Sequence, residues 1–577
     1  MKRTLATLCA AAALATTATL QAQTTPNPAG LEVGGLIFNH DQLMPWDFAS
    51  LSRTQNFGSA RAMAMGGAFA SLGADITAMS LNPAGLGMYR QSEFALTPLL
   101  SIARSDTPGT QSWSDNGRTR FAFANIGAAI NVFQSAKGGL TNVTIGFGMN
   151  RIADFNRRYS YSAESRYEAG GGPVASMADL FADQLQKGTW SPGSGWTPIL
   201  PKPTPDGPNG QLDFGHPYFW PATLAYKGTL IHIGQNGRWE RDAIGHNASI
   251  RRSVDAVESG SINEFDISAG FNIDNVLYLG ATLGIQSVSK RSDITYGEDY
   301  GYFNGTDGHA TDAAGNVLPV QLDWSDLWQR TTIDGSGVNF KVGAIVRPVA
   351  GLRLGVAYHS PTFYSLDWSY RAGLEAELLY NDGTNDTEFM RIESPVQAAE
   401  GGDRWSFVSP SRLMFGASYA FGRIAILSVD YERGWYNGIR VKHTPTGADF
   451  SPNDYKAEFK SKFRAANTLR AGLEVRPLPN FALRAGGGYS SSMLKDESLG
   501  REMPLATESY YLTAGAGVAL SPTVTLDLAY QYLNDKQSSY ALFYNRDADT
   551  GRIEATSGLF DTSLARHYIA LTLGFRF

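Results

Sequence analysis

The side chains that could carry out chemistry form no catalytic pattern along this chain. The sequence has no Gly-x-Ser-x-Gly nucleophile turn, no His-Glu-x-x-His zinc motif and no phosphate-binding loop. Three of its eight histidines, His216, His232 and His246, share one segment, and imidazole nitrogens can hold a metal or haem. Their spacing matches no helical pair of ligands, so we expect no enzymatic activity, no metal site and no cofactor.

A second group of residues could bind apolar molecules. In the segment 173–185, apolar side chains recur at helical spacing, and the proline at its start suits a first helical turn. Two interpretations are open: the helix packs on its own loop, or it forms an apolar capture groove with two aromatic residues near 220. The residues concerned are Val174, Met177, Phe181, Leu185, Phe219 and Trp220.

The elements that would position these residues are predicted to be strands. From Phe265 to Ile273 every odd-numbered side chain is apolar and the side chains between are polar or very small. This period of two is typical of a strand that faces two different environments. The alternation restarts after Asp274 and Asn275, which predicts a hairpin with a two-residue turn.

The same test predicts fourteen strands. The count is even, as closed bacterial barrels require, and most segments are long enough for a tilted strand to cross a bilayer. They lie near 93–103, 120–133, 141–153, 260–273, 276–288, 336–347, 352–360, 411–421, 424–432, 466–476, 481–489, 510–520, 524–532 and 565–577.

The connections alternate between short and long, as periplasmic turns and extracellular loops do. The short ones are 134–139, 274–275, 348–351, 422–423, 477–480 and 521–523. The long ones are 104–119, 154–259, 289–335, 361–410, 433–465, 490–509 and 533–564.

A soluble β-sandwich would alternate too, but its outward positions should be polar. Here Leu469 and Leu473 share one face while Arg470 and Glu474 share the other, as expected for an apolar wall around a charged lumen. We therefore predict an all-β fold, a 14-stranded antiparallel transmembrane β-barrel with long extracellular loops. No run of about 18 apolar residues follows the first 22, so no membrane-spanning helix is expected.

The first 22 residues indicate export from the cytoplasm. Lys2 and Arg3 precede an uncharged stretch, and a plausible cleavage point follows Ala22, as in a secretory signal peptide. The only cysteine, Cys9, lies within it, so the mature chain is expected to have no thiol and no disulfide. The net charge of −6 gathers into no long block, which argues against a nucleic-acid partner.

Between the signal peptide and the first strand lie about seventy residues without alternation. They are rich in small side chains around Gly66 and Gly67, and they contain the turn Asn82-Pro83-Ala84. Small residues allow close backbone packing, so we expect this segment to fold into the lumen as a plug.

At these residues the chain resembles the FadL and toluene-channel family of outer-membrane transporters, in which a small-residue-rich N-terminal hatch with an Asn-Pro-Ala motif precedes a fourteen-stranded barrel. The longer motif Asn-Pro-Ala-Gly-Leu-Gly looks like the branch common in Bacteroidetes. The resemblance implies three parts: a signal peptide at 1–22, an N-terminal extension and hatch at 23–91, and a barrel at 92–577 whose longest extracellular loop is 154–259.

The resemblance also implies a function in the outer membrane, namely transport of hydrophobic compounds such as long-chain fatty acids. Capture on extracellular loops would precede passage into the barrel and release gated by the hatch. Release through the wall is an alternative, and Pro98, Gly146 and Gly148 are the residues that could open it. Two other functions stay open, a shuttle for proteins in secretion and a receptor for haem or porphyrin.

The expected partners are a hydrophobic small molecule, outer-membrane lipid and lipopolysaccharide. The last segment alternates up to its final residue, Phe577, which resembles the assembly signal of bacterial outer-membrane proteins. We therefore also expect the barrel assembly machinery as a partner.

Overall fold

The structure is a computed structural model that describes most of the chain. The described residues are 33–34, 42–107, 117–191, 195–200, 202–204, 207–303, 309–381, 386–398, 403–446, 448, 450–496, 505–537, 539–546, 553–554 and 559–577. The expected signal peptide lies outside them. Within the described part, no helix has both the length and the apolar character needed to cross a membrane.

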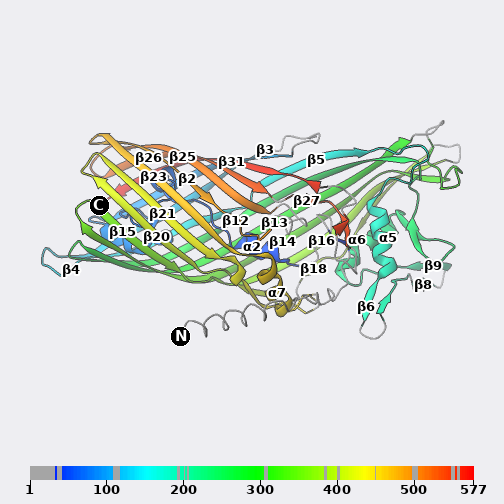
Figure 1. Cartoon of the computed structure of the whole chain (residues 1–577), viewed down its shortest axis with the longest axis horizontal. Coiled ribbons are helices and arrows are strands. Elements are labelled where there is room, and N and C mark those ends of the chain that lie inside the picture. The colour runs from blue at the N-terminus through cyan, green and yellow to red at the C-terminus, as the bar shows by residue number, and fades with distance from the viewer. Residues whose placement is uncertain are drawn as a thin grey trace, which may run out of the picture.

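Fourteen antiparallel strands form a closed barrel, which confirms the predicted fold (Figure 1). The ring closes because β31 pairs with β26 on one side and with β2 on the other. In ring order the strands are β2 (Glu93–Asp106), β3 (Gly117–Gln134), β4 (Leu140–Asp154), β12 (Ala248–Ile273), β13 (Leu277–Phe303), β14 (Val320–Val349), β15 (Leu352–His359), β20 (Arg412–Phe421), β21 (Ala425–Trp435), β23 (Ala465–Leu478), β24 (Phe481–Ser490), β25 (Ala506–Ala519), β26 (Val524–Gln537) and β31 (Ser563–Arg576).

The hairpin between β12 and β13 shows how local sequence sets the strand geometry. Asp274 and Asn275 have φ angles of 54° and 56°, and the Val276 amide donates to the Ile273 carbonyl at 3.0 Å. The turn is centred on Asp274 and Asn275 as predicted, but Ile273 pairs with Leu277, so Val276 is a third connecting residue. On β12 the side chain of Phe265 is 50% exposed while Glu264 is only 1% exposed, so the wall is apolar outside and charged inside.

Three barrel strands continue far beyond the barrel. β12, β13 and β14 contain 26, 27 and 30 residues, and β5 (Arg157–Ser165), β16 (Phe363–Tyr380) and β17 (Thr387–Glu393) extend the same sheet. We call this extension the wing (Figure 1). The sequence prediction that 289–335 and much of 361–410 are loops was therefore wrong. The wing's outer face meets water and carries charged residues. A prediction that looks for apolar residues at outward positions therefore places the end of each strand too early in the wing.

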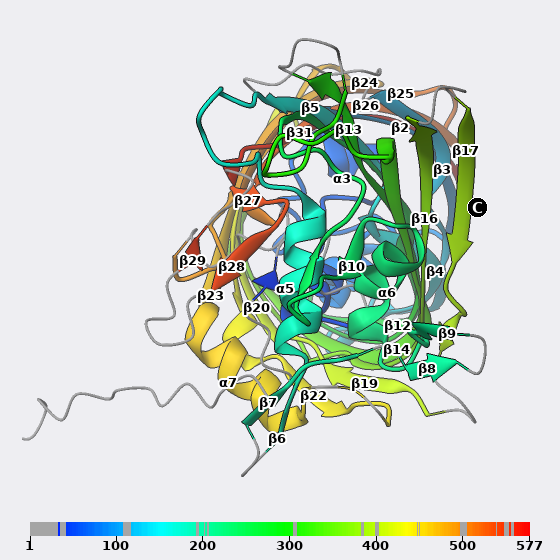
Figure 2. The same ribbon diagram turned by 90° about the vertical axis from the view of Figure 1, so that its right-hand side faces the viewer.

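Short elements cover the inner face of the wing and its surroundings (Figure 2). The helix predicted in 173–185 exists, but it begins at Met177 because Ser176 caps it, and Pro173 lies outside. These elements are α5 (Met177–Lys187), η2 (Pro217–Phe219), α6 (Trp220–Lys227), η3 (Tyr436–Gly438), α7 (Pro452–Lys462), β1 (Val33–Gly34), β6 (Thr189–Ser191), β7 (Gly195–Thr197), β8 (Lys202–Thr204), β9 (Gly207–Gln211), β10 (Ile231–Ile233), β11 (Trp239–Arg241), β18 (Gln397–Ala398), β19 (Trp405–Val408), β22 (Arg440–His443), β27 (Tyr540–Ala541), β28 (Tyr544–Arg546), β29 (Ile553–Glu554) and β30 (Leu559–Phe560).

The segment before the first barrel strand lies inside the barrel. It contains α2 (Pro45–Leu51), α3 (Ala60–Ala64), α4 (Ala78–Leu81) and η1 (Pro83–Met88), and Figure 2, which looks into the barrel from the wing end, shows α3 within the ring. Most of its side chains from 57 to 89 are buried. We call residues 56–91 the hatch.

Candidate functional site

The Asn-Pro-Ala motif forms a fixed corner of the hatch. The side chain of Asn82 is fully buried, and its Nδ2 donates to the Ala70 carbonyl at 2.6 Å. Its Oδ1 accepts from the Ala84 amide at 3.1 Å, and Pro83 starts η1. One carboxamide thus joins two parts of the hatch, which explains why asparagine is needed at this position.

Inward glycines of the barrel lie in close contact with backbone and side-chain atoms of the hatch. At each of them an added Cβ would lie under 3.0 Å from a hatch atom, so any larger side chain would push the hatch away. These glycines are Gly146, Gly148, Gly270, Gly280, Gly343, Gly355, Gly416, Gly472, Gly486 and Gly515. On the hatch side, Gly66 and Gly67 have φ angles of 63° and 69°, and the Gly66 carbonyl accepts from the Tyr511 hydroxyl at 2.8 Å.

The residues considered for ligand capture lie together in one buried apolar cluster of the wing. Met177, Phe181 and Leu185 of α5 are fully buried and face the wing sheet. Trp220 stacks on Tyr370 of β16 with ring centroids 5.6 Å apart. The cluster also includes Phe219, and Val174 packs against its edge. In this structure the cluster is closed, with α5 and α6 seated on the sheet.

The same apolar cluster reaches the barrel mouth, where α2 closes it. Phe48 of α2 is fully buried among four rings, at centroid distances from 4.9 to 6.5 Å. These rings are Trp405 and Phe407 of β19 and Tyr455 and Phe459 of α7. We call them the aromatic pocket. Sequence reasoning missed it; the one local signal is the short Pro45–Leu51 helix with its apolar side chains.

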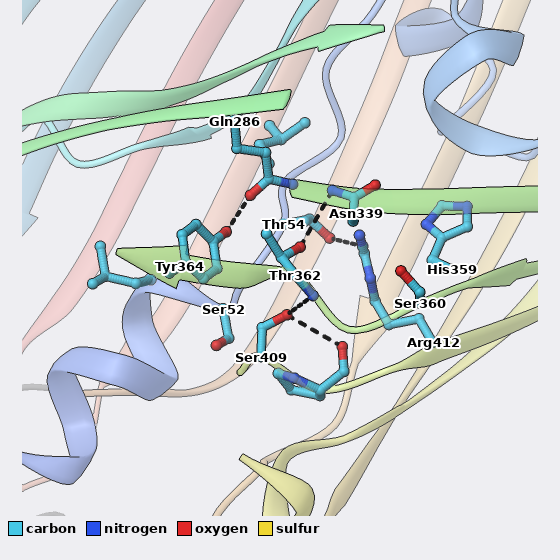
Figure 3. Close-up of a pocket in the computed structure, with 13 residues that line it drawn as sticks. Ser52, Thr54, Gln286, Asn339, His359, Ser360, Thr362, Tyr364, Ser409 and Arg412 are labelled. Carbon is cyan, nitrogen blue, oxygen red and sulfur yellow. Dashed lines mark hydrogen bonds between the residues drawn. The ribbon is translucent and has the colours of Figure 1, made fainter. Parts of the chain in front are cut away.

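Below α2, three small cavities lie among polar side chains of the lumen. A cavity of about 10 Å³ lies beside Ser52 and Thr54. Its lining is drawn in Figure 3, and there Arg412 reaches Thr54. Arg412 Nη1 donates to Thr54 Oγ1 at 2.6 Å. Two further cavities of about 40 and 60 Å³ lie beside Arg53. Such volumes hold one or a few water molecules and no fatty chain. An apolar molecule that enters any of these three cavities must therefore displace residues that line them, among them Ser52, Arg53 and Thr54.

The barrel wall has a break in its hydrogen-bond ladder, which we call the seam. Pairing of β3 with β4 ends at Asn125 and Asn150, although β3 continues to Gly117 and β4 to Asp154. Gln55 takes the place of the missing strand, since its amide donates to the Ile152 carbonyl at 2.8 Å. Its side-chain Oε1 also accepts from the Asp154 amide at 2.9 Å.

The seam does not coincide with the residues considered for a wall opening. At Gly146 and Gly148, β4 is paired with both β3 and β12. Pro98 lies at a bulge against β3, and the pairing of β2 with β31 is interrupted between Leu96 and Leu99. The seam begins two residues beyond Gly148 along β4.

Comparison with known proteins identifies the family. A family model described as outer membrane protein transport protein (OMPP1/FadL/TodX) matches residues 251–577, more than half of the chain. The chain belongs to this family. Its members are transport channels. They are outer-membrane proteins, and this FadL-type barrel is therefore placed in the outer membrane. No curated protein sequence matches the chain.

Solved structures support the FadL-type fold. The crystal structure of a Pseudomonas aeruginosa FadL homologue is 14% identical, with 91% of this chain and 99% of that chain covered and a TM-score of 0.51. The Pseudomonas putida toluene transporter TodX is 12% identical over 91% of this chain and 100% of its own, with a TM-score of 0.46. The monoaromatic hydrocarbon channel CymD is 13% identical over 90% and 98%, with a TM-score of 0.43. The shared fold rests on the first of these.

Charges in the lumen of this FadL-type barrel are paired with each other and with the hatch. Lys341 contacts both Glu264 and Asp266, the latter at 3.2 Å. Arg61 of the hatch bonds Glu474 at 3.1 Å. Buried charges need such partners because an unpaired one is costly. The described residues contain no group of three side chains suited to hold a metal ion.

Proposed function

We propose that this protein carries hydrophobic compounds, such as long-chain fatty acids, inward across the outer membrane. The molecule would be captured on the extracellular wing, pass into the barrel and leave when the hatch moves. One observation carries the proposal: the apolar cluster runs without interruption from α5 and α6 of the wing to Phe48 in the barrel mouth. Within a family of outer-membrane transport proteins, such a path suits an apolar cargo.

Capture would take place where α5 and α6 rest on the wing sheet. Phe181, Leu185 and Trp220 now contact other apolar side chains of the cluster. If a hydrocarbon chain enters between the helices and the sheet, these residues contact the chain instead. One apolar contact replaces another, so the free-energy cost is small. The N-terminus of α5 is fixed to β13 by the Met177 amide, which donates to Glu298. Beyond it, Phe181 and Leu185 belong to the apolar cluster, whose packing has no fixed direction. We therefore assign capture to Val174, Met177, Phe181, Leu185, Phe219 and Trp220.

Passage into the barrel would require the cargo to replace Phe48 in the aromatic pocket. The pocket is built from β19, which pairs with β16, and from α7, so it does not depend on α2 for its shape. α2 has only 7 residues, and so short a helix has little stability without packing. An apolar molecule in the pocket would thus release the segment that fills the lumen below.

Release would follow movement of the same segment. Gln55 bonds the free edge of β4, so its departure leaves the seam without its inner partner. Met79 of the hatch fills the space beside Gly146 and Gly148, and its departure would remove the inner support of the wall there. We therefore combine the two release routes into one. The hatch moves first, and the wall then opens beside Gly146, Gly148 and the bulge at Pro98.

A disulfide that locks the hatch tests this proposal. Ala70 of the hatch shares a buried cluster with Ala357 of β15, whereas at Gly280 an added Cβ would lie under 3.0 Å from the Ala84 amide. The double variant Ala70→Cys with Ala357→Cys is therefore the better lock, subject to a Cα separation below about 7 Å. Oxidised cells should take up radiolabelled oleate at least about tenfold more slowly, and reduction should restore uptake.

Each single cysteine variant serves as the control under oxidising conditions. Binding of oleate to the purified locked protein should be retained. Uptake at the native rate in the oxidised double variant would show that the hatch is a static plug. Absence of oleate and toluene uptake by the unmodified protein would overturn the proposed function itself.

A further inference from the structure

Two arginines at the end of the barrel opposite the wing depart from the pairing of charges in the lumen. Figure 1 places β15 and the C-terminus at this end. Arg347 lies near the end of β14 and Arg353 near the start of β15, on either side of the short connection 348–351. Because Val346 pairs with Leu354, the next residue of each strand brings the two arginines side by side, and the charge of Arg347 acts on Arg353. Among the described residues, neither guanidinium forms an ion pair or a hydrogen bond.

Both arginine side chains point into the lumen. Their neighbours Val346 and Leu354 point outward to the lipid, with 38% and 42% of their side chains exposed. Strand alternation therefore turns Arg347 and Arg353 inward. The register agrees, because Arg353 lies opposite Ser418 of β20, which is only 4% exposed. The two guanidinium groups thus stand in the opening of the lumen at this end.

The pair lacks a negative charge that other arginines at this end possess. Arg476, beside the short connection 477–480, contacts Glu474 at 2.8 Å. Arg61 of the hatch adds a further positive charge that acts on Arg353. Like charges that face each other across a strand pair destabilise it. An anion bound between Arg347 and Arg353 would remove this repulsion.

An apolar group flanks the two arginines. Tyr278 of β13 lies opposite Ile345, two residues before Arg347. Both pack against Ala84 of η1, and Met88 lies at the edge of the same cluster. When the hatch moves, Tyr278 and Ile345 lose these partners and present apolar surface to the lumen. Such a flank suits a ligand with a hydrocarbon tail better than a free inorganic anion.

We propose that Arg347 and Arg353 form an exit site for the carboxylate of an anionic amphiphile, whose tail replaces η1 against Tyr278 and Ile345. A carboxylate accepts the forked bonds that guanidinium donates, and it supplies the charge that the pair lacks. An ionised carboxylate also needs a counter-charge where water is scarce, whereas a neutral hydrocarbon does not.

The position of the exit site fits the last step of inward transport. The short connections are predicted to lie in the periplasm, so cargo would meet the two arginines as it leaves the barrel. The site rests on the proposed function and narrows its cargo, since a carboxylic acid with a long chain would pass more readily than a neutral hydrocarbon.

Uptake of radiolabelled oleate and of oleyl alcohol, which has the same chain without the charge, tests the proposal in cells that make the full-length protein. Uptake by cells without the protein is subtracted. In the double variant Arg347→Gln with Arg353→Gln, oleate uptake should fall at least about tenfold relative to oleyl alcohol, because charge-assisted bonds are lost. Both probes must pass the hatch, so a change in gating alone would alter both alike. A heat-modifiable band on gels shows that each variant is folded.

The double variant Lys137→Gln with Arg423→Gln is the matched control. Lys137 and Arg423 are exposed residues of the short connections 134–139 and 422–423 at the same end of the barrel. This variant removes the same amount of positive charge but leaves the arginine pair intact. Its ratio of oleate to oleyl alcohol uptake should equal that of the native protein.

The results separate the exit site from the proposed function. A native ratio in the Arg347 and Arg353 variant would overturn the exit site and leave the proposed function in place. An equal fall of the ratio in the control variant would also overturn it, because any positive charge at this end would then suffice. If the unmodified protein takes up neither probe, the proposed function fails and the exit site fails with it.

Discussion

Replacement of Phe48 by alanine should release α2 from the barrel mouth while leaving the barrel intact. The ring of Phe48 is fully buried among four aromatic rings, and α2 has only 7 residues. Loss of a buried phenylalanine ring costs about 3 to 5 kcal/mol. Nearly all of this cost falls on the docking of α2, because the fourteen strands are held by their own ladder.

The size of the expected effect follows from that cost. Since about 1.4 kcal/mol changes an equilibrium tenfold, the undocked fraction of α2 should rise roughly a hundredfold to several thousandfold. Hydrogen exchange of the amides from 46 to 52 measures this fraction directly. Exchange there should speed up by that factor, while amides of β12 and β13 keep their native rates. Uptake of an apolar substrate should rise as well.

Trp46→Ala is the control on the same helix. Trp46 is only partly buried at the edge of the cluster, so its loss should change exchange by less than about tenfold. If Phe48→Ala leaves the exchange of α2 at its native rate, the aromatic pocket does not hold α2. The account of how cargo enters the barrel would then be wrong.

Three further predictions concern the hatch, the wing and the topology. Asn82→Ala removes the bond to the Ala70 carbonyl and should raise single-channel conductance, because the hatch loses about 1 to 3 kcal/mol of its seating. Burial and a facing glutamate raise the pKa of Asp326 on the wing to about 6, so the contribution of this group to wing stability is full at acid pH and is lost as the pH rises through 6. The pH dependence of trypsin resistance should therefore differ between the native protein and Asp326→Asn, with the native protein losing resistance relative to the variant as the pH rises through 6. Epitope tags within 154–259 should bind antibody on intact cells, and tags within 348–351 should not; equal labelling would contradict the assigned sides of the membrane.

The membrane-crossing strands could be predicted from the sequence because each one meets lipid on one side and a polar lumen on the other. Phe265 and Glu264 belong to opposite faces for this reason, and local alternation records it. The upper parts of β12, β13 and β14 meet water on the outside. Their alternation has the opposite sense, with apolar residues such as Val254 turned inward, and it was not recognised as strand.

The candidate site was predicted only in part, because it depends on contacts between distant segments. The hatch motif at Asn82 was found from its own residue types. Phe48 meets rings more than 350 positions away in the chain, and Gln55 replaces β3 beside β4 some 97 positions later at Ile152. No local pattern records such meetings. The arginines at 118 and 120 stand at alternate positions on β3, as the lumen-facing Glu264 and Asp266 do on β12, so they give no local sign of the seam.

The wing gives the protein a stiff reach above the membrane. β14 has 30 residues, or roughly 100 Å of strand at about 3.3 Å per residue, and only about ten of them are needed to cross the hydrocarbon layer. Its ladder with β13 has no register shift from Val346 to Trp324, so this length bends little. With the long connections outside the cell, as predicted, its outer end would stand at a set height above the outer leaflet, where antibodies and cargo would meet it before they meet the barrel.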